Sequence, residues 1–93
     1  MGTQNNHIVK IVKALAHRSR LRMLEEIARR GKVTCTEVGE IFDLAQPTIS
    51  HHLRLLIDAG LVYAEKDGRY SNLTVNKEAL KELTSYISET VAF

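Results

Sequence analysis

Apolar residues recur at helical spacing in the middle of the chain and stop at a glycine. Between Gln46 and Gly60 they fall within one arc of a helix, an arc that also includes a histidine and can be buried (Ile49, His52, Leu53, Leu56 and Ile57). Pro47 suits the first helical position, where a missing N–H loses nothing, and Gly60 suits the position just past the end. The pattern predicts a helix with one packed face and one free face.

The free face of this helix is polar and carries short side chains. Thr48, Ser50, His51 and Arg54 lie on it, and its N-terminal half has no carboxylate. Hydroxyl, imidazole and guanidinium groups are typical partners of DNA base edges and phosphates. The composition therefore favours a helix that lies against nucleic acid.

Another helix is predicted immediately before this one. Thr34 and Glu37 have the spacing of a capping box, so this helix begins at Cys35. Gly39 lies inside it at a cost of about 1 kcal/mol relative to alanine, which predicts that another helix backbone crosses closely there. Residues 43–45 form the turn. The pair is either a helix-turn-helix or a simple helical hairpin in a small helical protein.

The segment that follows favours the helix-turn-helix. Residues 61–66 and 69–75 are predicted strands, and Asp67-Gly68 suits a two-residue type I′ turn between them. The tip of this hairpin is basic and aromatic (Lys66, Arg69 and Tyr70). A basic hairpin directly after a DNA-facing helix resembles the wing of a winged helix-turn-helix.

Three motifs together resemble one protein family. They are ALAHRSRLRMLEEI at Ala14 to Ile27, QPTISHHLRLLIDAGLV at Gln46 to Val62, and DGRY at residues 67–70. This combination is similar to the ArsR/SmtB family of small winged-helix repressors, and the similarity extends from about Ile8 to the last helix. The resemblance implies a mainly α fold of about five helices with a β-hairpin wing, and a homodimer that binds operator DNA. No repeat or linker divides the chain, so residues 1–93 are predicted to form one domain.

The resemblance also assigns roles to individual side chains. It implies that the free face of the second helix and the hairpin tip contact DNA (Gln46, Thr48, Ser50, His51 and Arg54; Lys66, Arg69 and Tyr70). Two such helices, related by the dimer two-fold, would enter successive major grooves of an inverted-repeat operator. The protein is thus predicted to be a transcriptional repressor. The bases that it reads do not follow from the residue types, because Gln, Ser and Thr accept several partners.

The two ends of the chain are predicted to form the dimer interface. A helix over about Asn6 to Ala16 places Ile8, Ile11, Val12 and Leu15 on one face, and Val9 lies off that stripe. A last helix, capped by Asn76, has a broad apolar arc that reaches Val91 and Phe93. Because this apolar surface exceeds one contact face, we expect a partner to cover part of it. The interface residues predicted in this way come from both helices (Ile8, Val9, Val12, Leu80, Leu83, Tyr86 and Ile87).

Composition and charge restrict the class of protein less than the motifs do. The net charge is only +2, but seven Lys and Arg residues lie between Lys10 and Arg30, where a solvated helix face is the simpler interpretation. No apolar run approaches the roughly 18 residues that would span a bilayer, and MGTQNNH is not a signal sequence. A single cysteine indicates a reducing compartment, so a cytoplasmic location without membrane contact is expected.

The usual metal site of the family is not expected. Where many relatives have a Cys-x-Cys pair, this chain has Thr34 and Thr36, and a hydroxyl does not replace a thiolate for a soft metal. The last helix, from Lys77 onwards, contains no His or Asp. Of the histidines, His52 is predicted to be packed and His51 to face DNA, whereas the two near the first helix lack a Cys or carboxylate at ligand spacing (His7 and His17). We predict no metal, no cofactor and no identifiable small-molecule inducer.

Cys35 is a candidate for a reactive thiol because of its place in the predicted helix. In the first turn of a helix, the helix dipole could lower the pKa of Cys35 and make it a thiol or redox sensor, but an inert, partly buried residue is the simpler interpretation.

An enzyme is not expected, because Ser50 and His51 are adjacent on a helix and no phosphate-binding loop is present. A winged helix used only for protein contacts is the other alternative. Leu55 alone approaches an apolar anchor on the outer face, so DNA binding is preferred.

Overall fold

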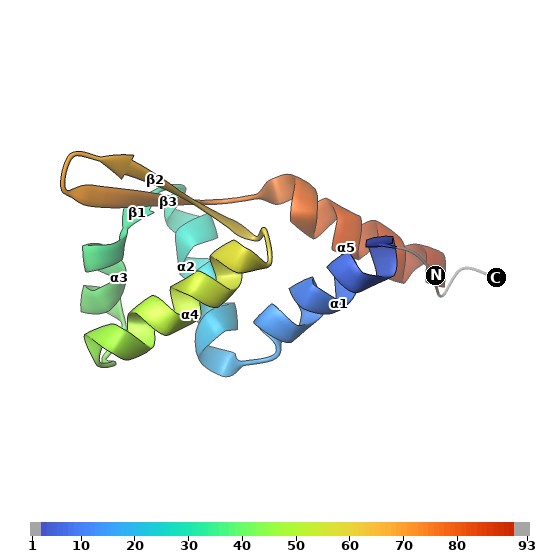
Figure 1. The fold of residues 1–93 in the computed structure, drawn as a ribbon, viewed down its shortest axis with the longest axis horizontal. Coiled ribbons are helices and arrows are strands. Elements are labelled where there is room, and N and C mark those ends of the chain that lie inside the picture. Colours follow the sequence, from blue (N-terminus) through green and yellow to red (C-terminus); the bar gives the residue numbers. More distant parts are fainter. Residues whose placement is uncertain (1–2, 91–93) are drawn as a thin grey trace.

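A computed structural model describes residues 3–90, with side chains from Asn6 onwards. Five helices and three strands follow one another along the chain (Figure 1): α1 (Thr3–Leu15), α2 (Arg18–Arg30), β1 (Val33–Thr34), α3 (Cys35–Ile41), α4 (Gln46–Asp58), β2 (Val62–Asp67), β3 (Tyr70–Val75) and α5 (Lys77–Thr90). The predicted fold of five helices with a hairpin is confirmed. Val91 and Phe93, the last residues of the predicted apolar arc, lie outside the described residues.

The core lies where α2, α3 and α4 meet the sheet. Helical periodicity brings together the core residues of α2, α3 and α4, which pack with Leu73 of β3 (Met23, Leu24 and Ile27 of α2, Val38 of α3, and Ile49, Leu53 and Leu56 of α4). The predicted arc of α4 is confirmed, because four of its members are buried and Ile57 packs against the core. Burial of this arc fixes the opposite arc of α4 on the surface.

The sheet contains a strand that the sequence did not indicate. The strand order is β1-β3-β2, with both pairings antiparallel. β1 is only two residues long, Val33 opposite Leu73 and Thr34 opposite Asn72, so it has no periodicity that could be recognised. It links the start of α3 directly to the hairpin.

The hairpin turn differs from the prediction by one residue. Asp67 pairs with Tyr70, so the two loop residues are Gly68 and Arg69 rather than Asp67 and Gly68. Gly68 has φ +66°, and no described residue other than glycine has a positive φ. A positive φ at only the first loop position is the pattern of a type II′ turn, whereas type I′ requires it at both. The type I′ prediction was wrong.

The predicted caps of α3 and α5 are present. Glu37 N–H donates to Thr34 Oγ1 at 3.1 Å, and Thr34 N–H donates to Glu37 Oε1 at 2.8 Å, which completes the capping box. Asn76 accepts from Ala79 N–H at 3.3 Å and donates through Nδ2 to the Gly60 carbonyl at 2.8 Å. Gly60 has φ +78°, as expected for a residue just past a helix end. Asn76 therefore joins the start of α5 to the end of α4.

Helices α1 and α5 lie side by side at the end of the molecule opposite the hairpin tip (Figure 1). α1 begins earlier than predicted, at Thr3, and ends at Leu15. Its buried positions are Ile8, Ile11 and Ala14, whereas Val12, which was predicted to share a face with Ile8 and Ile11 and to contact the partner, is 47% exposed. The true stripe is rotated because α1 packs on α2, α4 and α5 at once.

Candidate nucleic-acid interface

All five predicted DNA-contacting residues of α4 are on the surface, on the side away from the core (Gln46, Thr48, Ser50, His51 and Arg54). We call this set the recognition face. The structure brings these side chains together because a single helix with one buried arc holds them at fixed angles. Arg54 takes part in no ion pair of the described residues, so its charge is available to a ligand. The recognition face therefore offers donors, acceptors and one uncompensated cation.

The N-terminus of α4 also favours an anion. Its N-cap is Ala45, which supplies no side-chain hydrogen bond, and Pro47 is the second residue of the helix rather than the first as predicted. The first turn of a helix carries a partial positive charge on its N–H groups. This partial positive charge lies beside Gln46 and Thr48, at the start of the recognition face.

Gly39 has a different neighbour from the one predicted. A Cβ atom added there would lie 3.2 Å from Oε1 of Gln46, so a side chain of α4, not a helix backbone, approaches α3 at this point. Such a contact is tighter than most Cβ contacts. The missing side chain at Gly39 thus leaves room for Gln46 to lie against α3. Periodicity could not show this, because the two residues meet only across the turn between the helices.

The wing does not hold its three predicted residues together. Lys66 pairs with Ser71, and alternation places this pair on the same face of the hairpin as Leu73, the buried residue of β3. Tyr70 pairs with Asp67 and lies on the opposite face. Lys66, Arg69 and Tyr70 are all exposed, but the structure separates Tyr70 from Lys66 and puts a carboxylate beside it.

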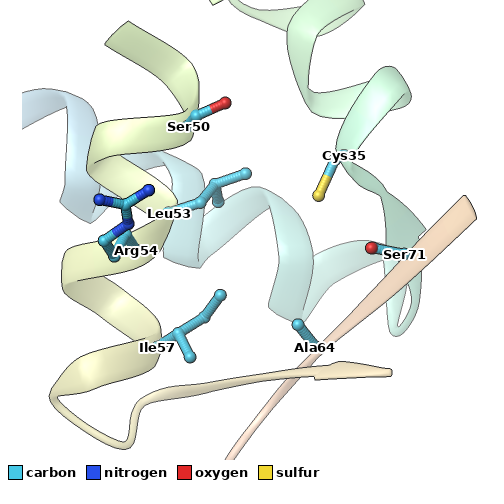
Figure 2. A pocket seen from close by; sticks show the side chains of 7 residues that line it. All are labelled: Cys35, Ser50, Leu53, Arg54, Ile57, Ala64 and Ser71. Atoms are coloured by element: carbon cyan, nitrogen blue, oxygen red, sulfur yellow. The ribbon is translucent and has the colours of Figure 1, made fainter. Parts of the chain in front are cut away.

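A small cavity of about 250 Å³ lies between α4, the start of α3 and the hairpin. Figure 2 shows Leu53 and Ile57 of α4 and Ser71 of β3 facing a common space, with Cys35 Sγ pointing into it from α3. Ser50 and Arg54 of the recognition face also line this cavity. Helix α4 and the β2–β3 hairpin are therefore not packed together along their whole length, because a cavity with an apolar floor lies between them.

The surroundings of the thiol in this cavity disfavour the thiolate. Burial raises the pKa of Cys35 above its usual value, and this effect outweighs a smaller opposing hydrogen bond from the backbone. The expectation that the helix N-terminus could lower this pKa was wrong. Desolvation of the thiolate wins because Cys35 packs partly against the core.

The basic segment of α2 is partly neutralised within the protein. Arg29 and Arg30 contact Glu26 at 2.6 and 2.9 Å. Hydrogen bonds from these two arginines lower the pKa of Glu26 to about 2. Arg20 turns inward and contacts the end of α1. These contacts support a solvated helix face rather than a nucleic-acid patch.

The histidines have distinct partners. His52 is 6% exposed and lies 3.3 Å from Arg20 Nη1, so the prediction of a packed residue is confirmed. His17 caps α2, where its Nδ1 accepts from Ser19 N–H at 3.2 Å. His7 Nε2 lies 3.3 Å from a carboxylate of Glu82 on α5, a partner that spacing along the chain could not show. In the described part of the chain, no three His, Cys, Asp or Glu residues are grouped to hold a metal ion.

This arrangement, a supported helix α4 followed by a hairpin with a basic tip that β1 extends to a three-stranded sheet, defines a winged helix-turn-helix domain. Residues 15–62 match a protein family described as a helix-turn-helix domain. The arsenical resistance operon repressor of Bacillus subtilis is 38% identical over 73 residues, which cover 78% of this chain and 70% of that protein. The chain belongs to the ArsR family of transcriptional regulators.

Other known proteins agree with this assignment. An uncharacterized HTH-type transcriptional regulator of Methanocaldococcus jannaschii is 32% identical over 80 residues, covering 86% of this chain and 90% of that protein. The crystal structure of an ArsR family transcriptional regulator has a TM-score of 0.84 and 28% identity, and covers 92% of this chain and 88% of that chain. A homodimeric winged helix-turn-helix DNA-binding domain of Mycobacterium bovis is similar in fold (TM-score 0.75, 21% identity, covering 95% of this chain and 83% of that chain). None of the helices in residues 3–90 is long and apolar enough to span a membrane.

Proposed function

We propose that this transcriptional regulator is a homodimeric repressor that binds an inverted-repeat operator through the recognition face of α4. The observation that carries the proposal is an exposed, polar helix face with an unpaired cation, whose opposite arc is buried in the core, next to a hairpin with a basic tip. The Bacillus subtilis relative is named as an operon repressor, which supports repression rather than activation of transcription. Repression would follow from occupation of the promoter.

The side chains divide into two roles. Gln46, Thr48, Ser50 and His51 are assigned to base edges, because they lie in the first two turns of the helix, the part that enters deepest into the major groove. Arg54, Lys66 and Arg69 are assigned to phosphates, since none of the ion pairs in residues 6–90 engages their charges. Tyr70 is assigned a weaker contact with DNA than Lys66 or Arg69, because it shares its face of the hairpin with carboxylates.

The dimer is assigned to α1 and α5. Val9, Val12 and Ile87 are 49%, 47% and 52% exposed, and they lie on the two helices that end the molecule. Exposed apolar side chains on two helices that contact each other are typical of an interaction surface. The other predicted interface residues contribute less, because Ile8 is buried in its own protomer and three more are partly buried there (Leu80, Leu83 and Tyr86). The homodimeric domain with the same fold supports this assembly.

We further propose that this regulator does not sense a metal through the family's site on α3. Thr34 Oγ1 already accepts a hydrogen bond in the capping box, and both Thr34 and Thr36 lack the thiolate that soft metals require. Arsenical sensing, which the name of the Bacillus subtilis relative suggests, is therefore not assigned to this chain. A cytoplasmic site of action follows from the proposed DNA target.

Fluorescence anisotropy with DNA from upstream of its own gene tests the proposal. We expect tight, salt-dependent binding by a dimer, and we expect Gln46→Ala or Ser50→Ala to relax base preference. Lys81→Ala is a suitable control, because Lys81 is an exposed cation on α5, away from the recognition face. Binding no tighter than to unrelated DNA would contradict the proposal and favour a winged helix used for protein contacts.

A further inference from the structure

Arg20 joins three helices at one point. Its Nε donates to the Ala14 carbonyl at 2.6 Å, and its Nη2 donates to the Lys13 carbonyl at 3.3 Å. These carbonyls belong to the last turn of α1, where helix acceptors have no partner within the helix. The third contact, from Nη1 to His52 Nδ1 at 3.3 Å, reaches the recognition helix. One guanidinium on α2 thus connects the end of α1 to the buried side of α4.

The contact with His52 fixes the state of the imidazole. A guanidinium has only donors, so Nδ1 of His52 accepts a hydrogen bond only when it is unprotonated. His52 is also the only buried polar or charged residue among those described. Its ring packs against His17, with 4.6 Å between ring centroids. The neutral imidazole with its proton on Nε2 therefore fits this site, and the imidazolium does not.

The basic groups around His52 all disfavour its protonated form. The groups that influence it are Arg20 on α2, His17 just before α2, and His51 on its own helix, whose ring centroid lies 5.9 Å away. All three are basic. Burial first, and then these neighbours, lower the pKa of His52 below its usual 6.5. Protonation would place a cation against Arg20 and turn an acceptor into a donor.

We propose that Arg20 and His52 are positioning residues that clamp the recognition helix to the end of α1, and that protonation of His52 opens this clamp and weakens operator binding. The proposal rests on the proposed DNA-binding function. His52 touches no DNA in this scheme, since it lies on the buried arc. It acts by holding the neighbouring side chains of α4, including His51, at the angle that the groove requires. Because α1 also carries part of the proposed dimer surface, the clamp sets the recognition helix relative to the partner.

His51 must be separated from this effect, because it is a second histidine and lies on the recognition face. A positive charge on His51 would add to the attraction between the recognition face and the DNA polyanion and would strengthen binding on acidification, which is the opposite sign. The experiment therefore uses His51→Gln as the background. In this background, His52→Asn is compared with the unchanged His52, because the Asn Oδ1 can occupy the position of Nδ1 as an acceptor that does not titrate. Anisotropy is recorded with operator DNA at pH 8.0 and 5.5 at constant ionic strength.

With His52 present, we expect operator affinity to fall between pH 8.0 and 5.5 by up to about tenfold per protomer, because pH 5.5 lies one unit below the usual pKa of 6.5 that the released imidazole regains. With His52→Asn, binding at pH 8.0 is retained and the loss at pH 5.5 is largely abolished. Arg20→Lys, which keeps one charge but not three contacts, should weaken binding at pH 8.0 and flatten the pH response. An equal loss with His52 and with Asn, or no loss in either, would overturn the clamp. Failure of the His51→Gln protein and of the unsubstituted protein to bind at pH 8.0 would instead refute the proposed DNA-binding function, and the clamp's role in it.

Discussion

The salt dependence of operator binding gives the sharpest test of the roles assigned to the basic residues. Arg54, Lys66 and Arg69 are exposed in each protomer and unpaired within the described residues, so a dimer would neutralise about six phosphates. Each contact contributes about −0.9 to the slope of log K against log salt concentration, which gives a slope of about −5.4. Between 50 and 200 mM salt, affinity should therefore fall by about three orders of magnitude.

Arg54→Ala removes two of these contacts from the dimer. The slope should change from about −5.4 to about −3.6, and affinity for unrelated DNA should fall by the same factor as affinity for the operator. Arg54 is exposed and packs little, so the fold should be unaffected, and circular dichroism checks this. Anisotropy titrations at four or more salt concentrations provide the slope, with Lys81→Ala as the control whose slope stays unchanged. An unchanged slope for Arg54→Ala would refute the assignment of Arg54 to phosphate, and a loss confined to the operator would make it a base contact instead.

Three further predictions concern the dimer, the α4–α5 joint and the thiol. Val12→Asp should place a charge on the apolar face of α1 and convert the dimer to monomer at micromolar concentration, as seen by sedimentation velocity; an unchanged sedimentation coefficient would move the interface elsewhere. Asn76→Ala should destabilise the fold by about 1–2 kcal/mol in urea unfolding, because it removes a helix cap and leaves the Gly60 carbonyl unpaired. Asn76→Asp keeps the cap but not the amide donor, so an intermediate loss is expected, and no loss in either variant would contradict the joint. Cys35→Ser should leave operator affinity and the response to peroxide unchanged, since burial raises the pKa of this thiol; a response that disappears would identify Cys35 as a sensor.

Features set by neighbouring residues could be predicted from the sequence. The buried arc of α4 follows from apolar spacing, and the capping box of α3 follows from hydrogen bonds between residues three apart. The exposure of the recognition face follows in turn from that arc. These features depend on interactions within one or two helical turns, so the order of residues along the chain contains the information.

Contacts between distant segments were decided only by the tertiary structure. The two-residue strand β1 exists because Val33 meets Leu73, and no local pattern marks it. The position of the turn, the approach of Gln46 to Gly39 and the ion pair between His7 and Glu82 likewise join separate elements. The sequence determined that α4 has a polar face to offer, because helical periodicity is local. The packing of whole elements determined what holds that face in place, including the contact of Arg20 with His52, because burial and non-local hydrogen bonds exist only after the helices have met.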